Sequence, residues 1–184
     1  VRDYGAKGNG IADDGPAIKA AIDYAMSFNQ QKTPDVIFPA GVYRVTSPII
    51  IGGYSLNPEY LFVSSPVYRY AYSSFYRSLE YAKGTRSAQL RIKGEGIVSI
   101  YGDFNDSTEL KPIIAYQAAG DGRNLTSTLQ STGEISNIGI YAKGFFDANG
   151  KPQPRVVPPF RKNNQVGLLA TYTNGLRVYN VSFH

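Results

Sequence analysis

The sequence predicts an all-β solenoid that begins with one amphipathic helix. The composition favours β-structure, because Gly (19) and Tyr (15) are abundant while charged residues (18%) are sparse for a helical protein. From residue 36 onward, short runs of β-branched and aromatic residues alternate with Gly, Asn and Asp, as expected for strands joined by turns. Two of these runs resemble each other, which predicts stacked, repeating coils.

The helix is predicted over about residues 13–30, where Ile18 and Ile22 belong to an apolar stripe at helical spacing. Asp13 or Asp14 is placed to accept hydrogen bonds from its first free N–H groups. Paired carboxylates could instead bind a metal or serve in acid–base chemistry. We favour the structural interpretation, in which one carboxylate caps the helix and the other stabilises its positive end.

Strands are expected on both sides of this helix. We predict a short strand at the N-terminus, followed by a loop that Gly5, Gly8 and Gly10 punctuate. The later strands are expected at residues 36–38, 42–45, 49–51, 89–93, 97–101, 113–116, 135–141, 166–172 and 176–183. The repeat lies in two of them, because residues 135–141 and 178–184 share alternating apolar positions and an Asn at the third place. The offset between the two runs fits one long coil or two short coils.

Two segments interrupt the strand pattern. Residues 54–87 are rich in Tyr, and their periodicity fits a helix as well as a strand. Residues 145–164 are rich in Pro and predict a surface loop. The first segment could bind carbohydrate, because tyrosine rings can stack on sugars; the candidates are Tyr68, Tyr70, Tyr72 and Tyr76. Core or subunit-interface packing of these rings is the simpler alternative, and we favour it.

The composition also bounds the chemistry. Cysteine is absent, which excludes a disulfide scaffold and a cysteine zinc site. His184 is the only histidine, so we expect no histidine triad, no metal site and no cofactor. The net charge of +5 favours acidic partners such as anionic polysaccharides, but no nucleic-acid motif or basic stripe is present, so nucleic acid is not expected. No apolar run reaches the ~20 residues of a membrane span.

One stretch carries a family resemblance. The segment Arg2-Asp-Tyr-Gly-Ala-Lys-Gly-Asn-Gly-Ile-Ala-Asp-Asp14, the helix, and Val36-Ile-Phe-Pro-Ala-Gly-Val-Tyr-Arg-Val45 resemble the N-terminal signature of the pectate-lyase-like superfamily. Leu90-Arg-Ile-Lys-Gly-Glu-Gly96 is similar to a later coil of that superfamily. The resemblance implies a right-handed parallel β-helix whose open end the helix caps. Among its members, this opening most resembles bacteriophage tailspikes and capsule depolymerases.

The resemblance implies a tailspike-type protein that binds and depolymerises a bacterial surface polysaccharide. Its expected partners are the polysaccharide, two further copies in a homotrimer, and other virion tail proteins, and its expected location is the virion tail or the extracellular space. Two alternatives remain open: a non-catalytic carbohydrate-recognition module, and a bacterial or fungal pectin-type hydrolase or lyase.

No catalytic residues are assigned, because the acids outside the helix cap show no paired arrangement on one strand. These acids are Glu59, Glu80, Glu95, Asp103, Asp106, Glu109, Asp121, Glu134 and Asp147. The motif set of the polygalacturonase type is also missing. Residues 1–184 are expected to form the N-terminal part of a single β-helix domain. The chain lacks an initiating Met and stops within a strand-like run, so we expect it to be a fragment whose catalytic acids lie on later coils.

Overall fold

The computed structural model describes residues 1–27, 34–51, 90–104, 111–117, 133–153, 165–171 and 176–184. Within these ranges the chain is mostly β-strand, with one α-helix and one short 3-10 helix. The elements are, in chain order, η1 (Arg2–Tyr4), β1 (Asn9–Asp13), α1 (Gly15–Ser27), β2 (Val36–Val45), β3 (Ile49–Ile51), β4 (Arg91–Gly102), β5 (Lys111–Gln117), β6 (Glu134–Tyr141), β7 (Gln165–Thr171) and β8 (Arg177–Phe183).

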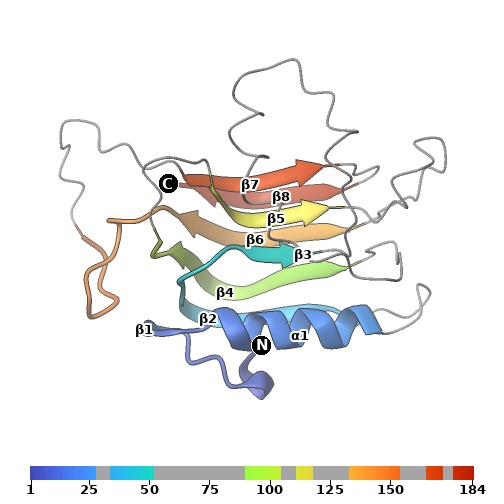
Figure 1. Ribbon diagram of the computed structural model, residues 1–184, viewed down its shortest axis with the longest axis horizontal. Helices are drawn as coiled ribbons and strands as arrows, with labels where there is room; N and C mark the ends of the chain where they lie inside the picture. Colours follow the sequence, from blue (N-terminus) through green and yellow to red (C-terminus); the bar gives the residue numbers. More distant parts are fainter. Residues whose placement is uncertain (28–33, 52–89, 105–110, 118–132, 154–164, 172–175) are drawn as a thin grey trace, which may run out of the picture.

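The named strands form two sheets, and every pairing between them is parallel (Figure 1). The larger sheet has the order β1-β2-β4-β6-β8, and the smaller has the order β3-β5-β7. The chain therefore alternates between the sheets, and we call one visit to both a pass. Each pass lies directly on the one before it, with ~4.8 Å between neighbouring strands.

Apolar side chains at equivalent positions of successive passes stack on one another to form the core. One such row on the larger sheet consists of Val36, Ile92, Ile135 and Val178. Ile92 and Ile135 are 1% and 0% exposed because a further strand covers each, whereas Val178 on the outermost strand is 41% exposed. Complete burial of one such side chain stabilises the fold by ~1.5–3 kcal/mol, so the stack depends on this alignment.

The predicted repeat is confirmed in its register. Ile135 pairs with Val178, and the Asn residues at the third position of each run lie next to each other. The Nδ2 atom of Asn180 donates a hydrogen bond of 2.7 Å to Oδ1 of Asn137. Both residues have a positive φ, 58° for Asn137 and 51° for Asn180, which Asn tolerates better than most residues.

Two expected turns are wrong, because the strands continue through them. β2 runs through residues 39–41, and β4 runs through residues 94–96. The reason is that the first half of β2 pairs with the first half of β4, and the second half of β2 with the second half of β4. The pairing therefore resumes after a register shift instead of ending. Gly96, with φ of 83°, takes up the left-handed conformation within β4 that Asn137 takes up within β6.

The N-terminal strand is also misplaced by the sequence pattern. Residues 2–4 form η1, and the first strand is β1, which lies within the expected glycine loop. The N-terminal ammonium group of Val1 donates a hydrogen bond of 2.8 Å to the carbonyl of Ile37. This contact fixes the start of the chain beside β2, while β1 adds to the edge of the larger sheet.

The helix α1 lies along one end of the stack, next to β2 (Figure 1). Ile18 and Ile22 are 0% and 1% exposed and belong to the same apolar cluster as the strand interiors. The helix therefore covers the core at the first pass with its apolar face. Residues 28–33, which include the predicted end of the helix, lie outside the described residues.

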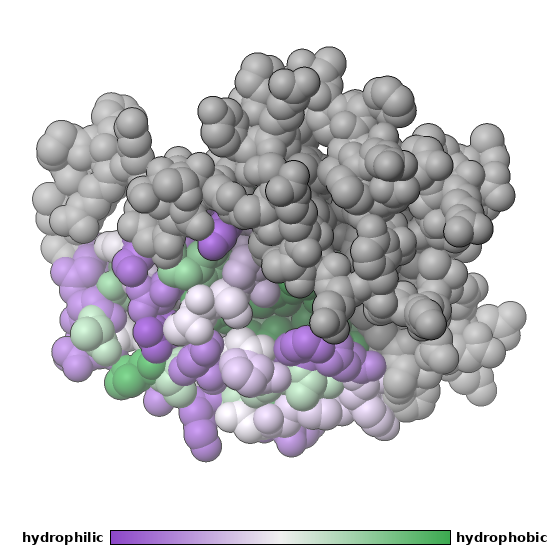
Figure 2. All heavy atoms as spheres, viewed as in Figure 1, coloured by the Kyte–Doolittle hydropathy of each residue, from purple (hydrophilic) through white to green (hydrophobic). Residues whose placement is uncertain are grey.

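The two interrupting segments are described only in part. The Tyr-rich segment 54–87 lies entirely outside the described residues, as does the second half of the Pro-rich segment, 154–164. Residues 142–153, which we call the strap, are described and extend along the side of the stack. Figure 2 shows that the surface on the side of the strap is mostly hydrophilic. Among the described residues, no helix has the length and hydropathy needed to cross a membrane.

Candidate functional site

The two predicted cap residues, Asp13 and Asp14, accept hydrogen bonds from different parts of the chain. Asp14 is 1% exposed, and its carboxylate accepts hydrogen bonds from the backbone N–H groups of Lys7 (2.6 Å) and Gly8 (3.1 Å). Its carbonyl accepts the first helical hydrogen bond, from Ile18. Asp14 thus ties the loop before β1 to the beginning of α1, and its carboxylate is occupied by backbone donors.

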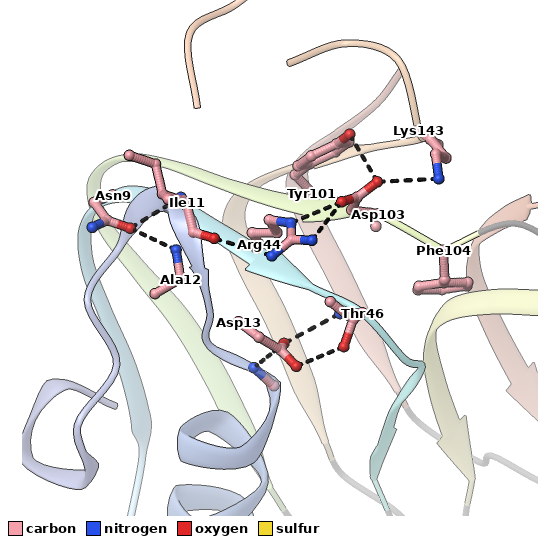
Figure 3. A network of polar contacts seen from close by, with 12 residues as sticks. Asn9, Ile11, Ala12, Asp13, Arg44, Thr46, Tyr101, Asp103, Phe104 and Lys143 are labelled. Atoms are coloured by element: carbon pink, nitrogen blue, oxygen red, sulfur yellow. Dashed lines mark hydrogen bonds and ion pairs between the residues drawn. The ribbon is translucent and has the colours of Figure 1, made fainter. Parts of the chain in front are cut away.

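Asp13 connects the helix to the strands. Its carboxylate accepts hydrogen bonds from the backbone N–H of Gly15 (3.1 Å), the N–H of Thr46 (3.2 Å) and the hydroxyl of Thr46 (2.6 Å), as Figure 3 shows. Among the described residues, no group of three or more His, Cys, Asp or Glu side chains is arranged to hold a metal ion. The contacts of both acids are those of structural residues.

The predicted sugar-binding tyrosines cannot be placed. Tyr68, Tyr70, Tyr72 and Tyr76 all lie outside the described residues. The described part of the chain offers a different candidate, a cleft between the strap and the side of the stack.

This cleft, which we call the Asp103 cleft, has a volume of about 320 Å³. Its lining comes from β1, β2, the end of β4 and the strap, and consists of Ile11, Arg44, Tyr101, Asp103, Phe146, Asp147 and Ala148. The strap closes one side because it folds back across several passes to reach β1. At their closest approach, a Cβ atom added to Gly150 would lie 2.5 Å from the carbonyl oxygen of Asn9.

The strap is held in shape by its own hydrogen bonds. The carboxylate of Asp147 accepts hydrogen bonds from the backbone N–H groups of Asn149 (2.8 Å) and Lys151 (2.9 Å), and Phe146 forms an antiparallel bridge with Pro152. The side chain of Gln165 adds an anchor by accepting a hydrogen bond from the N–H of Lys143 at 2.7 Å. The strap is therefore an ordered wall of the cleft.

A charged network lies at the centre of the cleft. Arg44 contacts one carboxylate oxygen of Asp103 through Nε at 2.8 Å and Nη2 at 2.7 Å, and Lys143 lies 3.3 Å from the other oxygen. Figure 3 shows these side chains pointing toward one another, with the hydroxyl of Tyr101 donating to Asp103 at 3.4 Å. The Nη1 atom of Arg44 also donates to the carbonyl of Ile11 at 3.0 Å, which joins β1 to the network.

The network determines the charge of Asp103. Burial alone would raise the pKa of its carboxyl, but the hydrogen bonds from Arg44 and Lys143, together with their positive charges, outweigh burial and hold that pKa below its ordinary value. Burial, together with the neighbouring Asp103 carboxylate, raises the pKa of the Tyr101 phenol. At neutral pH the cleft therefore presents an ionised carboxylate and a protonated phenol.

Aromatic rings form the remaining wall. The rings of Tyr101 and Phe146 lie 5.2 Å apart between centroids, and Phe146 is the same distance from Tyr141. Tyr141 in turn stacks on His184 at 4.5 Å with an interplanar angle of 9°. The cleft thus combines rings with hydrogen-bonding groups, a combination that suits sugar rings with their apolar faces and hydroxyl rims.

Comparison with known proteins gives one finding for the N-terminal region. Residues 1–56 match the model of a family described as rhamnogalacturonase A/epimerase, pectate lyase-like. Searches of curated proteins and of solved structures returned no match. The matched segment contains β1, α1, β2 and β3, and it supplies Arg44 and Ile11 to the cleft. The match supports the pectate-lyase-like superfamily, which is a polysaccharide-related family.

Two of the acids outside the helix cap line this cleft. Asp103 and Asp147 are far apart in the sequence, yet both line the Asp103 cleft. Glycoside hydrolysis needs one carboxyl group with a raised pKa as proton donor. The pKa of Asp103 is shifted in the opposite direction, and Asp147 is engaged by backbone N–H groups. The geometry therefore fits binding better than proton donation.

Sequence reasoning missed the partnership of Arg44, Asp103 and Lys143. The available signal was weak, because Arg44 lies within one expected strand while Asp103 and Lys143 follow two others. Their proximity depends on register: Arg44 pairs with Tyr101 across β2 and β4, which brings Asp103, two residues later, within reach of the guanidinium group.

Proposed function

We propose that this chain forms the capped start of a right-handed parallel β-helix in a bacteriophage tailspike-type protein. In this proposal the protein binds a bacterial surface polysaccharide, and the full-length protein depolymerises it. The observation that carries the proposal is that the segment matching a pectate lyase-like family folds as the helix-covered beginning of a parallel two-sheet stack.

The alternation between sheets supports the β-helix. Each pass leaves the larger sheet, adds a strand to the smaller sheet and returns to pair in parallel with its predecessor. Crossover connections between parallel strands of one sheet are right-handed in about 98% of proteins, which favours a right-handed coil. A helix over the first pass also protects apolar strand interiors that would otherwise face solvent.

The Asp103 cleft supports polysaccharide binding. It holds an ionised carboxylate that can accept hydrogen bonds from sugar hydroxyls, the donors of Arg44, and the rings of Tyr101 and Phe146. Because the proton-donor requirement of hydrolysis is unmet in this cleft, we place depolymerisation elsewhere in the full-length protein.

A non-catalytic recognition module is the second candidate, and the lowered pKa of Asp103 favours it. We further propose a location on the virion tail or outside the cell, a homotrimeric assembly and contacts with other virion tail proteins, as tailspikes have. These three statements come from the resemblance alone.

The decisive experiment incubates the full-length protein that carries this chain with purified bacterial capsule, with O-antigen polysaccharide and with pectin. Binding is measured by co-sedimentation, and chain shortening by size-exclusion chromatography. Binding with shortening supports a depolymerase, and binding without shortening supports the recognition module. Shortening of pectin alone would contradict the tailspike assignment, and absence of binding to every polymer would refute the proposed function.

A further inference from the structure

A second groove crosses the larger sheet and shares no lining residue with the Asp103 cleft. It has a volume of about 350 Å³ and runs over β4, β6 and β8. With strand spacings of ~4.8 Å, its floor extends ~10 Å along the stack, so it suits an extended ligand that crosses several passes. The side chains that matter for recognition are Ile97, Ser99, Asn137, Tyr141, Asn180 and Ser182.

The floor of this groove presents amide and hydroxyl groups. Asn137 and Asn180 are exposed, and their mutual hydrogen bond uses one donor and one acceptor, leaving Nδ2 of Asn137 and Oδ1 of Asn180 without a partner among the described residues. Ser99 is only 7% exposed, lines the groove, and has no hydrogen-bond partner for its hydroxyl in the described part of the chain. The Ser99 hydroxyl oxygen itself keeps solvent access, so it can bond to a ligand hydroxyl.

The rims of the groove are apolar. Ile97 is 87% exposed, because the segment Gly94–Val98 of β4 lies opposite only Asn137 and Ile138 of β6 and therefore bulges outward. On β6, the ring of Tyr141 lies against Gly139, where an added Cβ would be 2.6 Å from the ring. The isoleucine and the tyrosine line the groove together with its polar floor, and they can contact the apolar faces of sugar rings.

The charge of the groove limits the ligand. Among the described residues that line it, none carries a formal charge at neutral pH. A nucleic acid or an acidic polysaccharide would gain no ion pair here, whereas the Asp103 cleft contains Arg44, Asp103 and Asp147. The two sites therefore differ in the ligand charge that they favour.

We propose that the groove defined by Asn137 and Asn180 is a second polysaccharide-binding site, specific for a run of uncharged sugar units. This inference rests on the proposed polysaccharide function and adds to it a site and a sugar class. Binding at this groove is nearly independent of ionic strength, because no charged pair forms.

The test uses the full protein on an array of immobilised neutral and acidic bacterial polysaccharides, read at low and high salt. The immobilised neutral polysaccharides should bind wild-type protein equally well at both salt concentrations. Ile97→Ser removes an exposed apolar contact, and Asn137→Gly removes an amide while keeping a residue that favours positive φ. Each substitution should weaken binding of the neutral polysaccharides about tenfold, which corresponds to ~1.4 kcal/mol.

Two further variants separate the possible outcomes. Tyr24→Ser changes a side chain on α1 that is 52% exposed and lines neither site, so it should leave binding unchanged. Ile11→Ser changes the Asp103 cleft, where Ile11 is also 52% exposed. If Ile11→Ser alone weakens binding, or if only acidic polysaccharides bind and salt releases them, the groove is refuted while the proposed function stands. If no polysaccharide binds, both the neutral groove and the proposed function are refuted.

Discussion

The contact between the strap and β1 gives the sharpest test of the structure. Gly150 has φ of 72°, and a Cβ at this position would lie 2.5 Å from the carbonyl oxygen of Asn9 and 2.7 Å from Cα of Gly10. Both neighbours are backbone atoms, so they cannot move aside as a flexible side chain would. Gly150→Ala should therefore force the strap away from β1 and open the Asp103 cleft.

A matched variant separates the clash from the backbone strain. Gly144 lies in the same strap and has φ of 102°, but a Cβ there would meet nothing within 4 Å. A non-glycine residue in the left-handed region costs ~1–2 kcal/mol, and overpacking adds ~1–3 kcal/mol. Gly144→Ala should show only the first cost, and Gly150→Ala should show both.

The difference can be measured by calorimetry and hydrogen exchange on the whole chain. For a chain of this size, 1 kcal/mol shifts Tm by ~2–4 °C, so Gly150→Ala should melt ~2–12 °C below Gly144→Ala. If the strap detaches before the stack unfolds, hydrogen exchange at the backbone amides of Gly150 and Lys151 should be faster in Gly150→Ala and unchanged in Gly144→Ala. Equal Tm values together with equal exchange rates would show that the strap does not pack on β1 as described.

Three further perturbations test other contacts. Asp14→Ala leaves two backbone N–H groups unpaired, so it should lower the free energy of unfolding by ~2–4 kcal/mol in urea titration. The control Asp23→Ala breaks the exposed ion pair with Lys19 and should lower it by less than ~0.5 kcal/mol. Asn137→Gly should be ~1–2 kcal/mol more stable than Asn137→Ala, opposite to the usual order, because φ is positive there; equal stability would contradict the left-handed conformation. The lowered pKa of Asp103 stabilises the fold above the unfolded-state pKa of about 3.9, and this contribution is lost as pH falls through the folded-state pKa. The stability gap between wild type and Asp103→Asn should therefore be largest near neutral pH and shrink below pH ~4, and a gap independent of pH would refute the ion pair with Arg44.

Much of the strand order could be predicted because the local pattern and the tertiary pairing agree. The runs at 113–116 and 135–141 correspond closely to β5 and β6, and most of their apolar side chains are buried in the core. The repeat around Asn137 and Asn180 matches the register of β6 and β8, and the structure shows that one coil separates the two runs. A parallel stack places equivalent residues beside one another, so similarity along the sequence becomes contact in space.

The errors occur where pairing overrides a turn signal. The Gly-Glu-Gly of β4 and the Pro-Ala-Gly of β2 are typical turn sequences, yet both lie within strands. Neighbouring strands on both sides of β4 pair with its two halves, so the glycines bend the strand without ending it. Nothing in the sequence around Gly96 shows that pairing resumes at Val98 and Ser99.

The candidate sites could not be predicted for a related reason, since they arise where passes depart from the repeat. The extra residues of β4 between Gly94 and Val98 carry Ile97 out of the sheet and build one rim of the neutral groove. The strap is likewise an addition after β6, and its return to Gly10 encloses the Asp103 cleft. A regular stack would have flat sides, and sugar binding requires concave ones. Relative to β2, this stretch of β4 has one extra residue. Deleting Ile97 should therefore keep the pairing with β2 while weakening neutral polysaccharide binding, and retention of binding in a folded variant would show that the bulge is not part of the site.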